Sequence, residues 1–458
     1  MEELRCLVTG ATGYIGGRLV PRLLDEGYRV RAMARTPSKL DSESGGVPWR
    51  ERAEVVAGDL EDVDSLIAAF AGVDVVYYLV HSMGSSKNFA ADEARAVRNV
   101  VTAARQAQVR RVVYLSGLHP ENADLSTHLK SRTAVGQALI ESGIESVVLQ
   151  AGVVVGSGSA SFEMIRHLTD RLPVMTTPKW VHNRIQPIAI RDALHYLVAA
   201  AKVAVPSSRT WDIGGPDVQE YGDMIRIYAE VAGLRRRRLI VLPFLTPTIA
   251  SLWVGTVTPM PPGLARPLIE SLECDAVMRD RDIDTIIEPP PEGLTPYRRA
   301  VELALNPAAP GPPDATWASS RSEPAEPLPS DPDWAGDVVY TVRRTAVATA
   351  APDDVFAAAE RAANRRCIVH ERELGSRLRA RVRIRAPGRA WLDIAVAPRD
   401  GGGSTCALRA IFQPRGLAGR LYWFAARPLW SLALRRLARD VVGSSDVTRR
   451  TKAAVPAP

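Results

Sequence analysis

The first 150 residues alternate between short apolar runs and longer amphipathic segments. The apolar runs are rich in β-branched residues and read LRCLVT, YRVRAMA, AEVVAG, VDVVYYLV, RRVVYLS and IESVVLQ. Amphipathic patterns with helical spacing separate most of them, for example at 14–26 and 88–107. Strands that are apolar along their whole length are buried on both faces. The alternation therefore predicts an α/β fold with a doubly wound parallel sheet.

A smaller lobe and a separate module are expected after this region. Residues 151–305 read as further helices with isolated strands, which is typical of a substrate lobe attached to the sheet. Residues 306–332 are rich in proline and cannot bury a core, so they are predicted to be a linker. Residues 333–458 predict an α+β module that ends in a long helix at about 416–441.

Charge divides the chain in the same place. Residues 1–330 carry a net charge of −4 and residues 331–458 one of +11, so the basic character belongs to the C-terminal part. A basic module can meet anionic lipid, nucleic acid or an acidic partner, although dispersed surface arginine is the commoner case. Because no motif that reads nucleic acid is present, we expect no specific nucleic acid partner.

The cysteines and the N-terminus indicate a cellular compartment. The spacing of the cysteines predicts neither a disulfide framework nor a metal site, and the N-terminus runs directly into a strand pattern without a secretion signal. We therefore expect a cytoplasmic protein. The four cysteines are Cys6, Cys274, Cys367 and Cys406.

One stretch raises the question of membrane contact. Residues 235–260 place four arginines before an uncharged apolar run that is interrupted by Pro243, Pro247 and Pro259. Proline breaks helices, so we expect a buried helix of the second lobe rather than a membrane span. The alternative is a peripheral helix at a membrane surface, held there by the arginines.

A glycine-rich motif follows the first strand. VTGATGYIGGRL, residues 8–19, lies between this strand and a helix, and a second strand comes next. Glycine allows a tight turn and a close approach of the backbone to a diphosphate, and the helix N-terminus offers N–H groups. In this context a dinucleotide site is favoured over a purely structural turn. The residues predicted to bind the cofactor here are Gly10, Thr12, Gly13, Tyr14, Ile15 and Gly16.

The end of the second strand predicts which dinucleotide is bound. An acidic residue about 20 positions after the motif binds the ribose hydroxyls of NAD, whereas an arginine accommodates the 2′-phosphate of NADP. Arg35 stands at this position, with Lys39 close behind and no acid beside it. We expect NADP(H) rather than NAD(H), the alternative for Arg35 being a solvated strand end. Asp59 and Leu60, in GDL after the third strand, are further cofactor-binding candidates, with Asp59 beside the adenine ring.

These motifs resemble a known superfamily. VTGATGYIGG, VRAMART, GDL and YLVHSMG together are similar to the atypical, extended branch of the short-chain dehydrogenases/reductases, near the NmrA-like and isoflavone-reductase-like groups. IQPIAIRD and WDIGGPD resemble the elements that close the substrate lobe of that branch. The resemblance covers about 1–305 and implies a Rossmann fold that binds NAD(P).

The C-terminal part resembles a different family. FQPRGLAGRLYWFAARPLW, residues 412–430, is similar to the end of a domain of unknown function that is appended to such reductases. That domain resembles the SRPBCC (START-like) helix-grip fold, in which a curved sheet wraps a long helix around an apolar cavity. Here the connection after the predicted helix at 352–364 is short, which argues against a full-size cavity.

The first resemblance also implies catalytic positions. Relatives usually place a Tyr-x-x-x-Lys pair on the helix that follows a serine-bearing strand. Ser116 ends such a strand here, and His128 and Arg132 stand where the relatives have tyrosine and lysine. In one reading His128 is the acid/base, with a pKa near 6.5 that suits neutral pH, Arg132 binds ribose or substrate, and Ser116 polarises a carbonyl. In the other, the pair are surface groups on a helix that only binds cofactor. His81, in YLVHSMG, is either a second catalytic candidate or a loop residue that contacts the cofactor through its backbone.

Three functions follow from these observations. The leading one is an NADP(H)-dependent oxidoreductase that lacks the usual Tyr-x-x-x-Lys pair. Its substrate would be a hydrophobic carbonyl, enone, lipid or quinone-like molecule bound between the sheet and the small lobe. The alternatives are a non-catalytic NADP(H) sensor or scaffold, as the NmrA-like resemblance allows, and an isomerase or epimerase with a tightly held cofactor.

Overall fold

The computed structural model describes residues 4–40, 49–80, 89–121, 124–242, 251, 254, 258–305, 339–364, 367–373, 376–399 and 402–454. The chain divides into two compact units. Unit 1 comprises Met1–Arg321 with Ala325–Gly336, and unit 2 comprises Ser322–Pro324 with Asp337–Pro458. The predicted linker at 306–332 lies outside the described residues.

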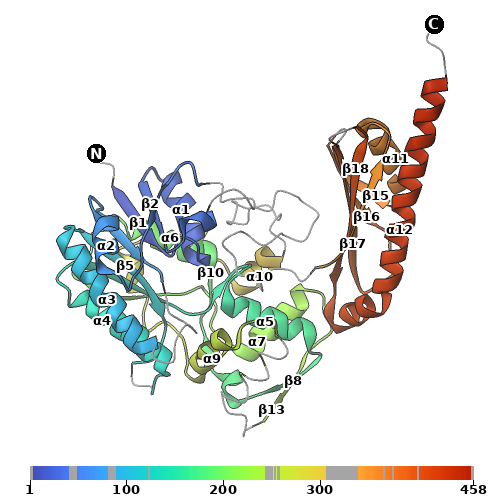
Figure 1. The fold of residues 1–458 in the computed structure, drawn as a ribbon. Coiled ribbons are helices and arrows are strands. Elements are labelled where there is room, and N and C mark those ends of the chain that lie inside the picture. The colour runs from blue at the N-terminus through green and yellow to red at the C-terminus, as the bar shows by residue number, and fades with distance from the viewer. Residues whose placement is uncertain are drawn as a thin grey trace. The chain divides into compact units, whose positions relative to one another are not determined.

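A seven-stranded parallel sheet forms the centre of unit 1, in the order β11–β6–β5–β4–β1–β2–β3 (Figure 1). The six apolar runs of the first 150 residues are β1 to β6, so the predicted α/β class is confirmed. The seventh strand, β11, pairs with β6, whereas the sequence assigned this segment to the small lobe. The strands are β1 (Arg5–Thr9), β2 (Arg29–Ala34), β3 (Glu54–Ala57), β4 (Val75–Tyr78), β5 (Arg111–Gly117), β6 (Glu145–Ala151) and β11 (Arg209–Ile213).

Helices cover both faces of this sheet because its strands are apolar on both sides. On one face Val8 and Val113 pack against α1 and α6, and on the other Leu7 and Val112 pack against α2, α3 and α4. The covering helices are α1 (Tyr14–Asp25), α6 (Ile190–Ala199), α2 (Val63–Phe70), α3 (Phe89–Gln106) and α4 (Thr127–Ile140).

The rest of unit 1 has its own core, centred on Phe162, Met224 and Tyr228. Its helices are α5 (Ala160–Arg171), α7 (Tyr221–Val231), α9 (Pro262–Glu270) and α10 (Tyr297–Leu305). Three two-stranded sheets join β7 (Val154–Val155) to β10 (Ile188–Ala189), β8 (Val174–Thr177) to β13 (Arg238–Val241), and β9 (Arg184–Ile185) to β12 (Gln219–Glu220). Short 3₁₀ helices lie at Pro37–Leu40, Lys179–His182, Ser271–Glu273 and Asp282–Thr285.

The arginine-rich stretch at 235–260 contains β13, so the expected helix is wrong for Arg238–Val241, whose backbone pairs with β8. Residues 243–250 of the stretch, and several after them, lie outside the described part of the chain. Among the described helices, none combines the length and the apolar character needed to cross a membrane.

Unit 2 is an antiparallel sheet in the order β14–β18–β17–β16–β15 with two helices, as the α+β prediction states. The last helix continues well beyond the predicted end at 441, and no proline occurs between residues 442 and 455 to end it. The elements are β14 (Tyr340–Ala348), α11 (Pro352–Asn364), β15 (Cys367–Glu373), β16 (Arg377–Val382), β17 (Gly388–Pro398), β18 (Ser404–Pro414) and α12 (Gly416–Ala454).

Aromatic rings pack between the sheet of unit 2 and the first half of α12. Trp423 of the helix stacks on Tyr340 and on Phe412, with centroid distances of 5.4 Å and 5.7 Å, and Trp430 adjoins Phe412. These rings therefore occupy the layer between the sheet and this part of the helix. The expectation that the short α11–β15 connection argues against a full-size cavity stays a prediction.

Candidate functional site

The glycine turn joins β1 to α1 at the carboxyl edge of the sheet. Gly10 has a φ of +66°, which favours glycine, and its carbonyl accepts a hydrogen bond of 2.8 Å from the Gly13 N–H. A Cβ on Gly16 would lie 2.3 Å from the Gly10 oxygen, so the helix and turn approach too closely for any side chain. Gly13 opens α1 without a side-chain cap, which leaves the first turn able to bind an anion.

The strand order brings the predicted adenosine-side residues to the same edge. β1, β2 and β3 are neighbours in the sheet, so the segments after their carboxyl ends lie side by side. Arg35 directly follows β2 and is exposed, and Asp59 and Leu60 follow β3. The Asp59 carboxylate accepts a hydrogen bond from the Glu61 N–H, and Leu60 is buried. Lys39 lies in the first 3₁₀ helix, and nothing is described of its side chain.

Ser116 and Arg132 both lie at the carboxyl end of β5, beyond the point between β1 and β4 where the strand order reverses. Ser116 is buried at the end of β5, where its hydroxyl acts on the neighbouring Tyr114 hydroxyl; by distance and angle its Oγ makes no hydrogen bond among the described residues. Arg132, on α4, donates from Nη2 to the Leu115 carbonyl oxygen over 2.8 Å, while its buried Nε has no partner within the same residues. Buried polar atoms are normally satisfied, so this pair is suited to receive a ligand.

His128 also faces inward, which excludes the reading of a solvated surface group. It is buried near the start of α4, where Ser126 caps the helix through the Leu129 N–H, and its ring lies 6.4 Å from that of Phe89. Burial, and then the charge of Arg132, lower its pKa to about 3. The pKa thus lies well below the intrinsic value near 6.5 on which the acid/base reading rests, and the ring is held neutral at physiological pH. His128 can exchange hydrogen bonds, but it is not an acid near neutrality. His81 lies outside the described residues.

Tyr114 does not replace the missing tyrosine. Its hydroxyl donates to the Arg132 carbonyl oxygen over 3.4 Å, but its ring is part of the core beneath α3 and α4. Burial raises the pKa of Tyr114 to about 12, and this outweighs the opposite effect of Arg132. A catalytic tyrosine needs a lowered pKa, so the arrangement is structural.

A buried carboxylate near this site was missed by sequence reasoning. Glu93, on α3, is buried and accepts a short hydrogen bond from the Ser131 hydroxyl, and its second oxygen has no partner among the described residues. Its charge contributes to the raised pKa of Tyr114. In the sequence Glu93 lies on an ordinary amphipathic helix, and no local signal marks it.

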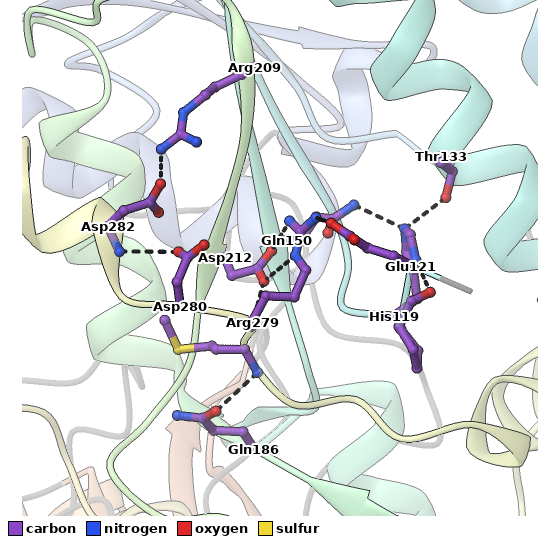
Figure 2. A network of polar contacts seen from close by, with 12 residues as sticks. His119, Glu121, Thr133, Gln150, Gln186, Arg209, Asp212, Arg279, Asp280 and Asp282 are labelled. Atoms are coloured by element: carbon purple, nitrogen blue, oxygen red, sulfur yellow. Dashed lines mark hydrogen bonds and ion pairs between the residues drawn. The ribbon is translucent and has the colours of Figure 1, made fainter. Parts of the chain in front are cut away.

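A second polar network, also missed, lies beyond the ends of β5, β6 and β11 (Figure 2). The His119 Nδ1 lies 3.1 Å from the Pro120 carbonyl oxygen, which can only accept, so Nδ1 carries the proton. Its Nε2 lies 3.1 Å from both the Gln150 amide nitrogen and the Thr133 hydroxyl. The network holds the loop after β5 against α4 and β6. His119 follows Ser116 by three positions, which is the one signal that could have drawn attention to it.

The centre of Figure 2 shows an ion pair between β11 and the segment around Arg279. Asp212 of β11 accepts two hydrogen bonds from the Arg279 guanidinium, at 2.8 Å and 2.7 Å, and a third from its main-chain N–H. Glu121 binds the same guanidinium from the loop after β5. Because Asp212 is buried, this contact fixes the segment around Arg279 to the sheet.

Together these residues fit a nicotinamide dinucleotide. The uncapped helix start and the Gly10–Gly16 cradle would hold the diphosphate, and the segments after β2 and β3 would hold the adenosine. The unpartnered atoms of Ser116 and Arg132 would face the nicotinamide side. No group of three or more metal-ligating side chains occurs within the described ranges.

The neutral state of His128 makes the stability of the protein depend on pH. Between the ordinary pKa of 6.5 and the folded value of about 3, the unfolded chain binds a proton that the folded chain does not. Stability should therefore fall as the pH falls through this window. His128→Gln, which does not titrate, should lose less free energy of unfolding than wild type between pH 7 and 5, by about 2 kcal/mol. Urea unfolding at both pH values measures this difference.

The exposed His182 supplies the control for that measurement, because its removal takes away no buried ring. Between pH 7 and 5, His182→Gln should lose as much free energy of unfolding as the wild type does. Equal pH dependence in wild type and His128→Gln would show that the ring is protonated, or solvated, in the folded state.

Two family models match the chain. Residues 10–158 match a family described as NAD(P)H-binding, and residues 342–437 match one described as a protein of unknown function (DUF2867). The first match covers the glycine turn, the segments after β2 and β3, and the Ser116–Arg132 pair. The expected binding of a nicotinamide dinucleotide is confirmed, whereas the choice of NADP(H) over NAD(H) stays a prediction.

Curated relatives match part of unit 1. A 3β-hydroxysteroid dehydrogenase/Δ5→4-isomerase of Mycobacterium tuberculosis is 34% identical over 123 residues, covering 24% of this chain and 31% of the relative. Cinnamoyl-CoA reductase 1 of Oryza sativa subsp. japonica is 36% identical over 119 residues, covering 25% of this chain and 34% of the relative. The chain thus spans about a third of the length of these relatives.

Solved structures share the fold of unit 1. An NADPH-dependent quinone oxidoreductase from Escherichia coli, complexed with NADPH, has a TM-score of 0.52 at 19% identity, covering 65% of this chain and 98% of that one. A Citrobacter triphenylmethane reductase complexed with NADP(H) has a TM-score of 0.51 at 20% identity, covering 66% and 100%. The chain therefore carries an NAD(P)H-binding domain of the Rossmann fold, followed by a domain of a family whose function is unknown.

Proposed function

We propose that unit 1 is an NADP(H)-dependent oxidoreductase that reduces a hydrophobic enone or quinone-like acceptor. The observation that carries this proposal is the pair of buried atoms that make no hydrogen bond within the described part of the chain, Ser116 Oγ and Arg132 Nε, at the edge where a nicotinamide would lie. Polar atoms of this kind are costly in an empty fold and become useful when a substrate oxygen binds them.

The protonation states near this pair favour one class of acceptor. The bound dinucleotide would supply a hydride. Ser116 Oγ–H would donate a hydrogen bond to the acceptor oxygen, and the Arg132 guanidinium would stabilise the negative charge that develops there. His128 is neutral and Tyr114 holds its proton tightly, so neither readily gives a proton to the product. Enones and quinones yield anions that are stabilised by delocalisation, whereas a simple ketone yields an alkoxide that needs a proton at once.

Arg35 supports NADP(H) as the cofactor. It is exposed directly after β2, where a guanidinium can bind a 2′-phosphate with two parallel hydrogen bonds. The reductases of known structure that share the fold include complexes with NADP(H), which is compatible with this choice.

The purified full chain should oxidise NADPH faster than NADH with at least one member of a panel of enones, quinones and ketones. Ser116→Ala should lower turnover by about tenfold to a hundredfold, because it removes one donor from the acceptor oxygen. Arg35→Ala should weaken NADPH about tenfold and leave NADH unchanged, since it removes one charge-assisted contact. Stopped-flow absorbance at the NADPH band measures the cofactor preference of the wild type and the effects of the two substitutions. Turnover by Ser116→Ala at the rate of wild type would overturn the assignment.

A non-catalytic NADP(H) sensor is the second candidate. It is favoured by the absence of the Tyr-x-x-x-Lys pair and by the lowered pKa of His128, which together leave the site without an evident acid. In that case the whole panel gives no turnover, although NADPH still binds and Arg35→Ala still weakens it. Binding and turnover measured on the same samples therefore separate the two functions.

A further inference from the structure

The outer side of α12 exposes large apolar side chains. Leu417, Leu421, Phe424, Leu429 and Leu432 have exposed fractions of 43%, 62%, 66%, 67% and 50%. The opposite side of the same helix is buried, with Trp423, Leu434 and Val441 packed over the sheet of unit 2. The helix thus has two apolar sides, and only the inner one is covered by the described residues.

The exposed residues form a continuous stripe. Leu417, Leu421, Phe424 and Leu432, with the exposed Pro428 between the last two, recur at the three- and four-residue intervals that place side chains on one face of a helix. At about 1.5 Å per residue the stripe is about 24 Å long. Leu429 widens it on one side. We call the exposed side chains at positions 417, 421, 424, 428, 429 and 432 the outer stripe.

Positive charge accompanies the outer stripe along the sequence. The sequence from 401 to 439 contains seven arginines and no aspartate or glutamate. Arg427 lies beside the stripe and is exposed, and Arg435, Arg436 and Arg439 are exposed on the turns that follow it. A partner for this surface must therefore accept apolar side chains and offer negative charge.

We propose that the outer stripe of α12 docks on the surface of a lipid bilayer that contains anionic lipid. Helices that carry leucine and phenylalanine on one face, with arginine at the borders of that face, are typical of segments that lie in a membrane interface. The apolar side chains would enter the acyl boundary, and the arginines would reach the lipid phosphates. A second copy of the chain fits this surface less well, because no acid between 401 and 439 is present to pair with the arginines of the facing helix.

Nucleic acid also fits less well. It would use the arginines, but it offers nothing to Leu421 or Phe424. The sheet of unit 2 provides a comparison, because its face away from α12 also carries exposed arginines, including Arg381 and Arg389. Each of these arginines is next in sequence to a residue that faces the helix, Val382 or Ala390. Among the described residues, no stripe of exposed leucines lies beside the two arginines. The two arginines therefore serve as a charge-matched control.

The test is flotation of the full chain with vesicles of phosphatidylcholine alone or with about one third phosphatidylglycerol. Wild type should float with the anionic vesicles only, and added salt should weaken the binding. Leu421→Ser/Phe424→Ser should stay unbound, and Arg435→Gln/Arg436→Gln should bind at least about tenfold more weakly. Arg381→Gln/Arg389→Gln, which loses the same charge, should bind like wild type. All these side chains are exposed, so the variants are expected to fold.

Several results would overturn the proposal. One is wild type that fails to float with anionic vesicles. Another is equal loss of binding in Arg381→Gln/Arg389→Gln, which would mean that total charge, and not the outer stripe, governs binding. A third is a dimer by light scattering that Leu421→Ser/Phe424→Ser converts to a monomer without any flotation of wild type, which would assign the stripe to a second copy.

Discussion

Gly16→Ala should lower the affinity for NADP(H) by about a hundredfold or more, because it disturbs at least two charge-assisted contacts to the diphosphate. The added Cβ would lie 2.3 Å from the Gly10 carbonyl oxygen and 2.9 Å from its carbonyl carbon. Both are main-chain atoms, so no side-chain rotation can relieve the overlap. The turn must move away from α1, and the N–H groups of the first helical turn then no longer converge on one anion.

Gly443→Ala is a matched control for this substitution. A Cβ at Gly443, in α12, meets no atom within 4 Å, so it adds a methyl group to a helix without strain. Isothermal titration with NADPH should therefore give the same dissociation constant for Gly443→Ala as for wild type. Circular dichroism of Gly16→Ala checks that the fold is retained. A dissociation constant within about twofold of wild type for Gly16→Ala would exclude the cradle as the diphosphate site.

The fold of unit 1 could be predicted because its signals are local. Each strand from β1 to β6 is a run of apolar, β-branched residues, and the helices between them show their own periodicity. The glycine turn is also local, since the turn, the helix start and the strand end are contiguous. β11 was assigned to the wrong part of unit 1 because strand pairing with β6 is a long-range property that a short run such as RTWDI does not encode.

The candidate site was predicted only in part, and the reason is environment. The sequence names His128 and Arg132, but the pKa of His128 depends on burial beneath α3, which no spacing reveals. Glu93 and Ser131 meet because α3 and α4 pack side by side, and the sequence places them 38 residues apart. Contacts of this kind arise from tertiary packing, so residue type alone does not distinguish them from solvated charges.

Arg132→Ala should weaken NADPH about tenfold to a hundredfold, because it removes a charged donor from the nicotinamide side of the site. If unit 1 is the proposed reductase, turnover should also fall by about a hundredfold, since the charge that stabilises the acceptor oxygen is lost. Arg132→Lys keeps a cation at the position where the reductases that this chain resembles have lysine. It should retain most of the NADPH affinity and most of the turnover. The pKa of His128 should rise in Arg132→Ala but stay below 6.5, because burial is the larger cause of its lowering.

Lys130 is the control for this experiment, as an exposed cation two residues earlier on α4. Its ammonium pairs with Asp124 over 2.6 Å, and both side chains are exposed, so Lys130→Ala should change neither binding nor turnover. A purely structural Arg132, needed only to hold the Leu115 carbonyl, would lower the melting temperature of Arg132→Ala while NADPH affinity stayed as in wild type. Arg132→Ala loses the bond to the Leu115 carbonyl under either role, so some fall of the melting temperature is expected in both; the nicotinamide-side role requires that NADPH affinity and turnover also fall. Titration of NADPH and thermal melting on the same preparations therefore separate a ligand-binding arginine from one that only braces the end of β5.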